Sequence, residues 1–104
     1  MKNRPHDAAV VELLKADPDF ANEYLAAALD EADEPGGQPA LLAALRHVAE
    51  AQGMAAVAER AGIPRESLYR ALGPKGNPTA KTLLAVLSAA GLHLAVTRQD
   101  SAHA

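Results

Sequence analysis

The 104-residue chain contains no cysteine, and this absence excludes several classes of protein. Disulfide frameworks, thiol catalysis and zinc sites with cysteine ligands all require that residue. Long hydrophobic runs are also missing, since no apolar stretch approaches the roughly 20 residues that span a bilayer. Near the N-terminus, Asp7 and Glu12 interrupt the apolar stretch that a signal peptide would need. We therefore expect a soluble, cytoplasmic protein with no membrane association.

Aromatic residues are scarce, at 3% of the chain, whereas hydrophobic residues as a whole make up 49%. Alanine and leucine supply most of this apolar content, and the aromatics are only Phe20, Tyr24 and Tyr69. Alanine and leucine are strong helix formers, while the β-branched and aromatic residues that favour strands are few. The length suits one domain. The composition therefore predicts a small all-α domain.

The spacing of apolar residues predicts a bundle of five or six helices. Glycine and proline clusters mark the breaks, and the segment 33–39, with two prolines and two glycines, is the clearest linker. Asp17 is predicted to cap the second helix, and either Asn77 or Thr79 the last one. The predicted helices cover approximately residues 7–16, 18–31, 40–51, 54–61, 64–72 and 79–90.

After Gly91 the hydrophobic period changes from that of a helix to that of a strand. Leu92, Leu94 and Val96 alternate with other residues, which predicts a short C-terminal β-strand over residues 92–97. A lone strand leaves its backbone groups unpaired, and no second strand is predicted in the chain. We expect these three residues to mediate antiparallel pairing in a homodimer, or else to extend the sheet of a protein partner. The remaining residues, 98–104, are expected to be a tail.

The net charge of −3 conceals an uneven distribution. Residues 1–35 hold three basic and nine acidic residues, a net charge of −6, whereas residues 36–104 hold seven basic and four acidic residues, a net charge of +3. From Arg60 to Lys81 there are five basic residues and a single acidic one. A local basic stretch of this kind suits contact with phosphate. The alternative is that charges on solvated helix faces segregate by chance.

Residues 54–73 have the spacing of a DNA-binding helix-turn-helix, within a predicted DNA-binding domain over residues 40–91. Ala58 supplies a small residue where the two helices approach, and Gly62 supplies the turn. The second helix carries arginines that can form forked contacts with guanine, and the loop after it carries a lysine suited to the DNA backbone. The predicted DNA-contacting residues are Arg65, Glu66, Ser67, Tyr69, Arg70, Lys75 and Asn77.

No residue pattern indicates a catalytic, metal or cofactor site. The four histidines, His6, His47, His93 and His103, share no metal-ligand spacing, and we interpret them as solvated or half-buried side chains. The serines lack the context of a nucleophile elbow, and the glycine-containing loop after residue 72 lacks P-loop spacing. We therefore expect neither an enzyme nor a bound cofactor or metal.

Several stretches together carry a family resemblance: LKADPDFANEYLAAAL at 14–29, RAGIPRESLYRAL at 60–72, KGNP at 75–78 and TLLAVL at 82–87. The chain resembles the probable addiction-module antidote proteins of bacteria, HigA-like antitoxins with a phage-repressor (XRE) type of helix-turn-helix. The resemblance implies a lambda-repressor-like fold and two activities. One is neutralisation of a RelE/ParE-superfamily toxin in a type II toxin–antitoxin module, and the other is repression of the shared operon by a dimer. Pro64 departs from the capping serine expected in many relatives.

The charge distribution adds a hypothesis about the toxin contact. Toxins that act on nucleic acid are typically basic, so the acidic helical hairpin predicted over residues 1–35 suits such a surface. The predicted toxin-contacting residues are Asp19, Glu23, Asp30 and Glu31. Two other functions stay open: a stand-alone transcriptional repressor of the XRE type without a toxin partner, and a helical adaptor that binds only protein.

Overall fold

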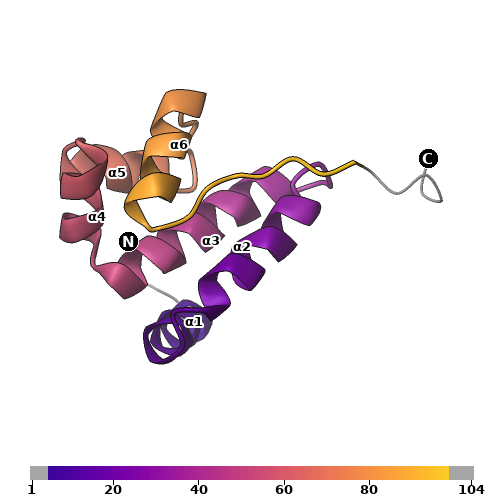
Figure 1. The fold of residues 1–104 in the computed structure, drawn as a ribbon, viewed down its shortest axis with the longest axis horizontal. Helices are drawn as coiled ribbons and strands as arrows, with labels where there is room; N and C mark the ends of the chain where they lie inside the picture. The colour runs from indigo at the N-terminus through magenta and orange to yellow at the C-terminus, as the bar shows by residue number, and fades with distance from the viewer. Residues whose placement is uncertain (1–4, 99–104) are drawn as a thin grey trace.

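Helices make up most of the computed structural model, which describes residues 5–98 of the chain. They are α1 (Pro5–Ala16), α2 (Phe20–Asp30), α3 (Gly37–Gln52), α4 (Met54–Ala61), α5 (Arg65–Ala71) and α6 (Ala80–Ala89), as Figure 1 shows. The predicted all-α class and the number of helices are confirmed. Within this range no helix combines the length and the hydrophobicity that a membrane crossing requires.

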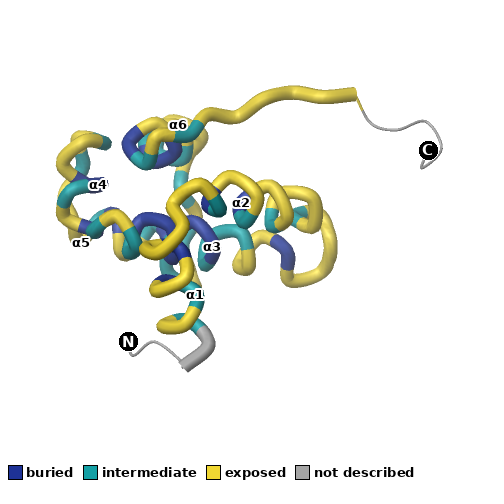
Figure 2. The backbone as a smooth tube through the Cα atoms, turned by 60° about the horizontal axis from the view of Figure 1, so that its bottom comes forward, coloured by how far each residue is buried: buried dark blue, intermediate teal, exposed yellow. Residues whose placement is uncertain are grey.

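The longest helix, α3, joins two groups of helices. On one side α1 and α2 pack against it, and on the other it contacts α4, which in turn contacts α5 and α6. Figure 1 shows α3 passing between α2 and the group formed by α4, α5 and α6. Along α3, the residues from Ala44 to Ala49 are buried except for half-buried Arg46. Burial is concentrated where the helices face one another, and their outer faces are exposed (Figure 2).

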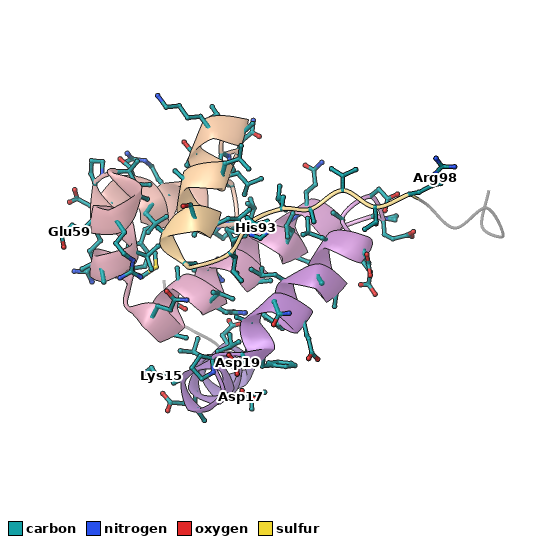
Figure 3. The ribbon with its side chains drawn as sticks, viewed as in Figure 1. Lys15, Asp17, Asp19, Glu59, His93 and Arg98 are labelled. Carbon is teal, nitrogen blue, oxygen red and sulfur yellow. The ribbon has the colours of Figure 1, made fainter. Side chains whose placement is uncertain are left out.

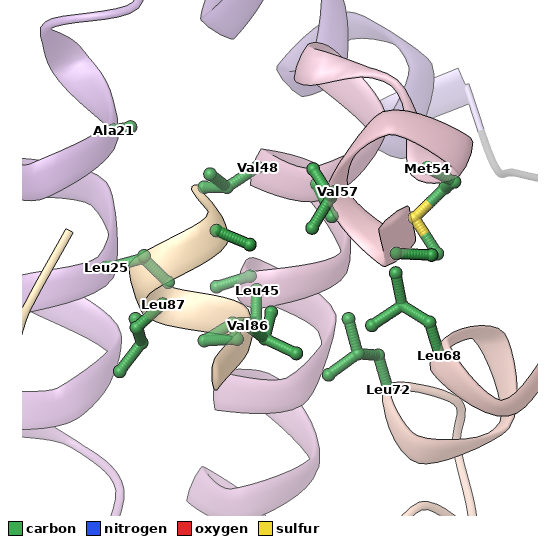
Figure 4. Close-up of a cluster of buried hydrophobic side chains, with 14 of the residues drawn as sticks. Ala21, Leu25, Leu45, Val48, Met54, Val57, Leu68, Leu72, Val86 and Leu87 are labelled. Atoms are coloured by element: carbon green, nitrogen blue, oxygen red, sulfur yellow. The ribbon is translucent and has the colours of Figure 1, made fainter. Parts of the chain in front are cut away.

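The hydrophobic core is continuous and receives buried side chains from every helix of the described chain, α1 to α6. Its most deeply buried side chains come from different helices: Val48 of α3, Val57 of α4, Leu68 at the centre of α5 and Val86 of α6 are at most 2% exposed. Figure 4 shows these side chains converging in one cluster, together with Leu72 just after α5. The apolar spacing read from the sequence therefore forms one core that fixes the orientation of α5.

The helix boundaries differ from the predicted ones where capping was involved. Asp17 does not cap α2, because its N–H bonds to the Leu13 carbonyl at 2.9 Å and so still closes α1. Its carbonyl accepts the Phe20 N–H at 3.0 Å in a tight turn, so α2 begins three residues later than Asp17. At α6, Thr79 is the cap rather than Asn77, since its Oγ1 accepts the Thr82 N–H at 3.1 Å.

The predicted strand over residues 92–97 is not formed within the described chain. Gly91, with φ +84°, ends α6, and the Leu92 N–H bonds back to the Leu87 carbonyl at 2.8 Å. Beyond that bond, residues 93–98 are extended, but no other part of the described chain pairs with their backbone. A strand requires a partner backbone, and this chain alone does not provide one. Most of the predicted tail, residues 99–104, lies outside the described range, as do residues 1–4 of the predicted hairpin.

One buried polar cluster ties α1, α2 and α3 together. His47 is only 3% exposed, so the prediction that it is solvated or half-buried is wrong. Its Nδ1 lies 2.7 Å from the Tyr24 hydroxyl, and its Nε2 lies 2.9 Å from Asp7 Oδ1. A carboxylate only accepts, so Nε2 donates to Asp7, and Nδ1 forms a hydrogen bond with the Tyr24 hydroxyl. Both ring nitrogens are satisfied, and this allows the imidazole to be buried.

Because of this cluster, the stability of the fold is expected to change with pH in the alkaline range. Burial, followed by the negative charge of Asp7, raises the pKa of Tyr24 above its ordinary value of 10.0. The folded chain therefore holds the tyrosine proton more tightly than the unfolded chain does. This contribution to stability is complete below pH 10.0 and is lost as the pH rises through the raised pKa.

We predict that the free energy of unfolding falls more steeply above pH 10 in the wild type than in Tyr24→Phe. The phenylalanine variant has no hydroxyl to deprotonate, so its stability does not include the loss that deprotonation of Tyr24 causes. Urea unfolding measured at intervals between about pH 8.5 and 11 tests this. Tyr69→Phe, which removes an exposed hydroxyl, is the control and should retain the wild-type slope. Parallel curves for the wild type and Tyr24→Phe would contradict the prediction.

Candidate nucleic-acid interface

Two consecutive helices, α4 and α5, are joined by a tight turn at Gly62. Gly62 has φ +74°, and its N–H donates to the Glu59 carbonyl at 3.1 Å. The N–H of the next residue, Ile63, donates to the Ala58 carbonyl at 3.0 Å. A side chain would have space at Gly62, so it is the left-handed backbone that favours glycine there. Pro64 follows in an extended conformation, and its carbonyl accepts the Leu68 N–H at 3.0 Å, which starts α5.

The inner face of α5 is fixed by the core and by an arginine from α3. Leu68 and Leu72 are fully buried. Arg46 of α3 donates from Nη1 to the Leu72 carbonyl at 2.9 Å, at the C-terminal end of α5. The carbonyls at a helix end have no partner within the helix, so this bond satisfies one of them. Packing on one side and a hydrogen bond at the end together determine which side of α5 faces solvent.

The outer face of α5 carries most of the predicted DNA-contacting residues, and the structure leaves them accessible. Arg65, Glu66, Tyr69 and Arg70 are exposed, and Ser67 is half-buried. The guanidinium carbon of Arg65 lies 5.6 Å from the centre of the Tyr69 ring, a cation–π contact. Within residues 7–98 the ion pair between Lys15 and Glu12 and the contact of His47 with Asp7 involve no residue of α5. The cationic groups of α5 therefore remain available to an external anion.

The loop after α5 places Lys75 beside this face. The Gly76 N–H donates to the Gly73 carbonyl at 2.9 Å, which folds the loop back over the end of α5. A Cβ atom on Gly76 would collide with the Ala71 carbonyl, so this close approach requires glycine. Lys75 is exposed and lines a shallow hollow with residues of the α5 outer face. Asn77 is also exposed, but it lines a neighbouring depression beside the start of α3.

Arg60 belongs to the same basic stretch of sequence but has a structural role. Its Nε donates to the Ala89 carbonyl at 2.8 Å, and its Nη2 donates to Gln52 Oε1 at 3.1 Å. Gln52 in turn donates to the Ala90 carbonyl at 2.9 Å. Arg60 therefore holds the C-terminal end of α6, as Arg46 holds that of α5. No local sequence pattern predicts either role, because each arginine lies more than 25 residues from the carbonyl that it binds.

The four predicted toxin-contacting residues are exposed, but they lie at opposite ends of α2. Asp19 precedes the helix and Glu23 is in its first turn, whereas Asp30 and Glu31 stand at its C-terminal end. Since α2 has 11 residues, its ends are about 16 Å apart. Figure 3 shows Asp19 close to Lys15 and Asp17, near the junction of α1 and α2. The structure therefore divides these acids into two pairs.

The predicted dimerisation residues differ in their surroundings. Leu92 is half-buried against the core, Leu94 is 43% exposed, and Val96 is 98% exposed. Residues 92–95 form one wall of a groove whose opposite wall is α2, including Leu29. Beyond the groove the extended segment continues past the helices toward Arg98 (Figures 1 and 3). We refer to the space between α2 and residues 92–95 as the α2 groove.

Comparison with known proteins identifies relatives of this chain. A family model described as "Probable addiction module antidote protein" matches residues 5–98. An uncharacterized protein of Haemophilus influenzae is 45% identical over 56 residues. That alignment covers 54% of this chain and 58% of the relative, so the match spans little more than half of either protein. No solved structure matches the chain significantly.

Proposed function

The chain belongs to the family of probable addiction module antidote proteins, and we propose that it is the antitoxin of a type II toxin–antitoxin module. In this proposal it acts in the cytoplasm by binding rather than by catalysis. It neutralises a toxin of the RelE/ParE superfamily through direct contact, and it represses the shared operon by binding operator DNA. The family match, which extends over residues 5–98, is the observation that carries the proposal.

For DNA binding, we propose that α4 and α5 act as a helix-turn-helix and that α5 enters the major groove. The accessible, unpaired guanidinium groups of Arg65 and Arg70 support this, since each can form two parallel hydrogen bonds with guanine. Glu66 is placed to accept from cytosine, while Ser67 and Tyr69 can bond to phosphate or to a base edge. Lys75, held beside α5 by its loop, is suited to the phosphate backbone.

We predict that Arg70→Ala weakens binding to a DNA fragment from upstream of the gene by about 1–3 kcal/mol, because it removes a base contact. Lys75→Ala should instead remove one phosphate contact. The slope of the logarithm of the binding constant against the logarithm of the salt concentration should then become shallower by about 1. Fluorescence anisotropy at several salt concentrations measures both effects. Lys15→Ala, on α1, is the control and should match the wild type. A wild type without salt-dependent DNA binding would contradict this half of the proposal and favour a protein-binding adaptor.

We also propose a homodimer, in which residues 92–97 pair antiparallel with the same segment of a second copy. The backbone of residues 93–98 supports this, since it forms no backbone hydrogen bond with the rest of the described chain. A two-fold axis at that pairing would relate two α5 helices, and operator binding requires them about 34 Å apart, one turn of DNA.

We predict that proline in this segment converts the dimer to a monomer. The N–H groups of consecutive residues in a strand point to opposite edges, and only one edge faces the second copy. We therefore expect one of the two variants, Ala95→Pro or Val96→Pro, to remove a pairing hydrogen bond. Both positions are exposed, so the helical fold should be retained. Sedimentation equilibrium measures the mass, and Val96→Thr, which keeps the N–H group, should remain dimeric. If both proline variants remain dimeric, pairing through this segment is wrong.

For toxin binding, the acids on α2 support contact with a basic partner. We predict that the quadruple charge reversal of Asp19, Glu23, Asp30 and Glu31 to lysine weakens toxin binding at low salt, and that added salt reduces the difference. The probe is the small basic protein expected from the neighbouring reading frame, purified and titrated by calorimetry. Glu59→Lys, an exposed acid on α4 (Figure 3), is the control. If no such protein is encoded or bound, the antitoxin function is wrong and a stand-alone repressor is favoured.

A further inference from the structure

The α2 groove combines an apolar lining with an open side. Leu25, Ala26 and Leu29 of α2 form one wall, Leu87 of α6 contributes from the end of the helix, and Leu92 and Leu94 form the other wall. The groove has a volume of about 370 Å³. Ala26 is exposed, and Leu29 and Leu94 are 40% and 43% exposed, so the apolar surface is accessible. Clustered, accessible apolar residues of this kind characterise binding surfaces.

The charged residues on the α2 side of the groove are acidic. Asp30 lines it directly, and Glu31, Asp33 and Glu34 follow on the exposed turn after α2. No lysine or arginine occurs in α2. On the opposite wall His93 lines the groove, and Arg98 lies farther along the extended segment (Figure 3). An apolar lining with an acidic rim is complementary to a segment that presents apolar side chains flanked by lysine or arginine.

We propose that the α2 groove is the toxin-binding site and that it holds an apolar segment of the toxin flanked by basic residues. This inference rests on the proposed antitoxin function and adds where and how the toxin is held. Asp30 and Glu31 then contact the flanking cations, whereas Asp19, at the other end of α2, lies outside the site. Residues 92–95 supply a wall of the site with their side chains, a use distinct from the backbone pairing proposed for the dimer.

The charge of the groove favours a different protein over a second copy of this chain. In a two-fold dimer each surface contacts its own equivalent. A contact of this kind with the two-fold axis at the Asp30 end of the groove would bring Asp30 and Glu31 close to the same acids of the other copy. Like charges facing each other across an interface are unfavourable. A basic partner gains from the same charges.

Two adjacent alanines of α2 provide a matched test. Ala26 lines the groove, whereas Ala27 does not, although both are exposed. Ala26→Arg would place bulk and positive charge in the groove, so we expect it to weaken binding of the purified neighbouring-gene protein at least about tenfold. Ala27→Arg adds the same charge outside the groove, so we expect it to weaken binding much less. Leu29→Ser should also weaken binding, unlike Leu84→Ser, which alters a leucine that is 51% exposed on α6.

Circular dichroism and thermal unfolding establish that each variant is folded before calorimetry. Equal affinities of Ala26→Arg and Ala27→Arg would overturn the groove assignment and leave the antitoxin function intact. Failure of the wild type to bind the neighbouring-gene protein would overturn the antitoxin function, and the groove assignment with it. If Ala26→Arg alone converts a dimer to a monomer in the absence of that protein, the groove holds a second copy and the assignment is also wrong.

Discussion

Burial of α3 between two groups of helices is the constraint on which the rest of the structure depends. Its inner positions are mainly alanine, leucine and valine, and the small alanines allow neighbouring helices to approach closely. Because α1 and α2 pack on one side of α3 and α4 on another, the orientation of each group is defined relative to this helix. Removal of apolar surface from water on both sides of α3 drives this arrangement.

Polar contacts made by α3 then fix the elements around it. His47 joins Asp7 and Tyr24 across three helices, while Arg46 and Gln52 donate to carbonyls at the C-terminal ends of α5 and α6. These carbonyls have no partner within their own helices, so a side-chain donor from α3 satisfies groups that would otherwise need water. The position of α5, and with it the accessible arginine face, therefore depends on residues that are distant in sequence.

The same arrangement separates two surfaces of opposite charge. α5 lies with α4 and α6 on one side of α3, and α2 lies on the other side (Figure 1). In the proposed function, DNA and toxin therefore meet different helices of one chain. Within residues 7–98 no ion pair joins the acids of α2 to the arginines of α5, and the two helices pack on different sides of α3.

The sequence by itself determined the all-α class, the positions of the helices and the outer face of α5. These features follow from local rules: the spacing of apolar residues, the left-handed conformation that glycine adopts at Gly62, and the side of a helix opposite Leu68. Contacts between distant residues were decided only by the tertiary structure. The burial of His47, the structural role of Arg60 and the groove between α2 and residues 92–95 each join residues more than 20 positions apart. Local pattern carries no information about such contacts, because they form only when packing brings separate helices together.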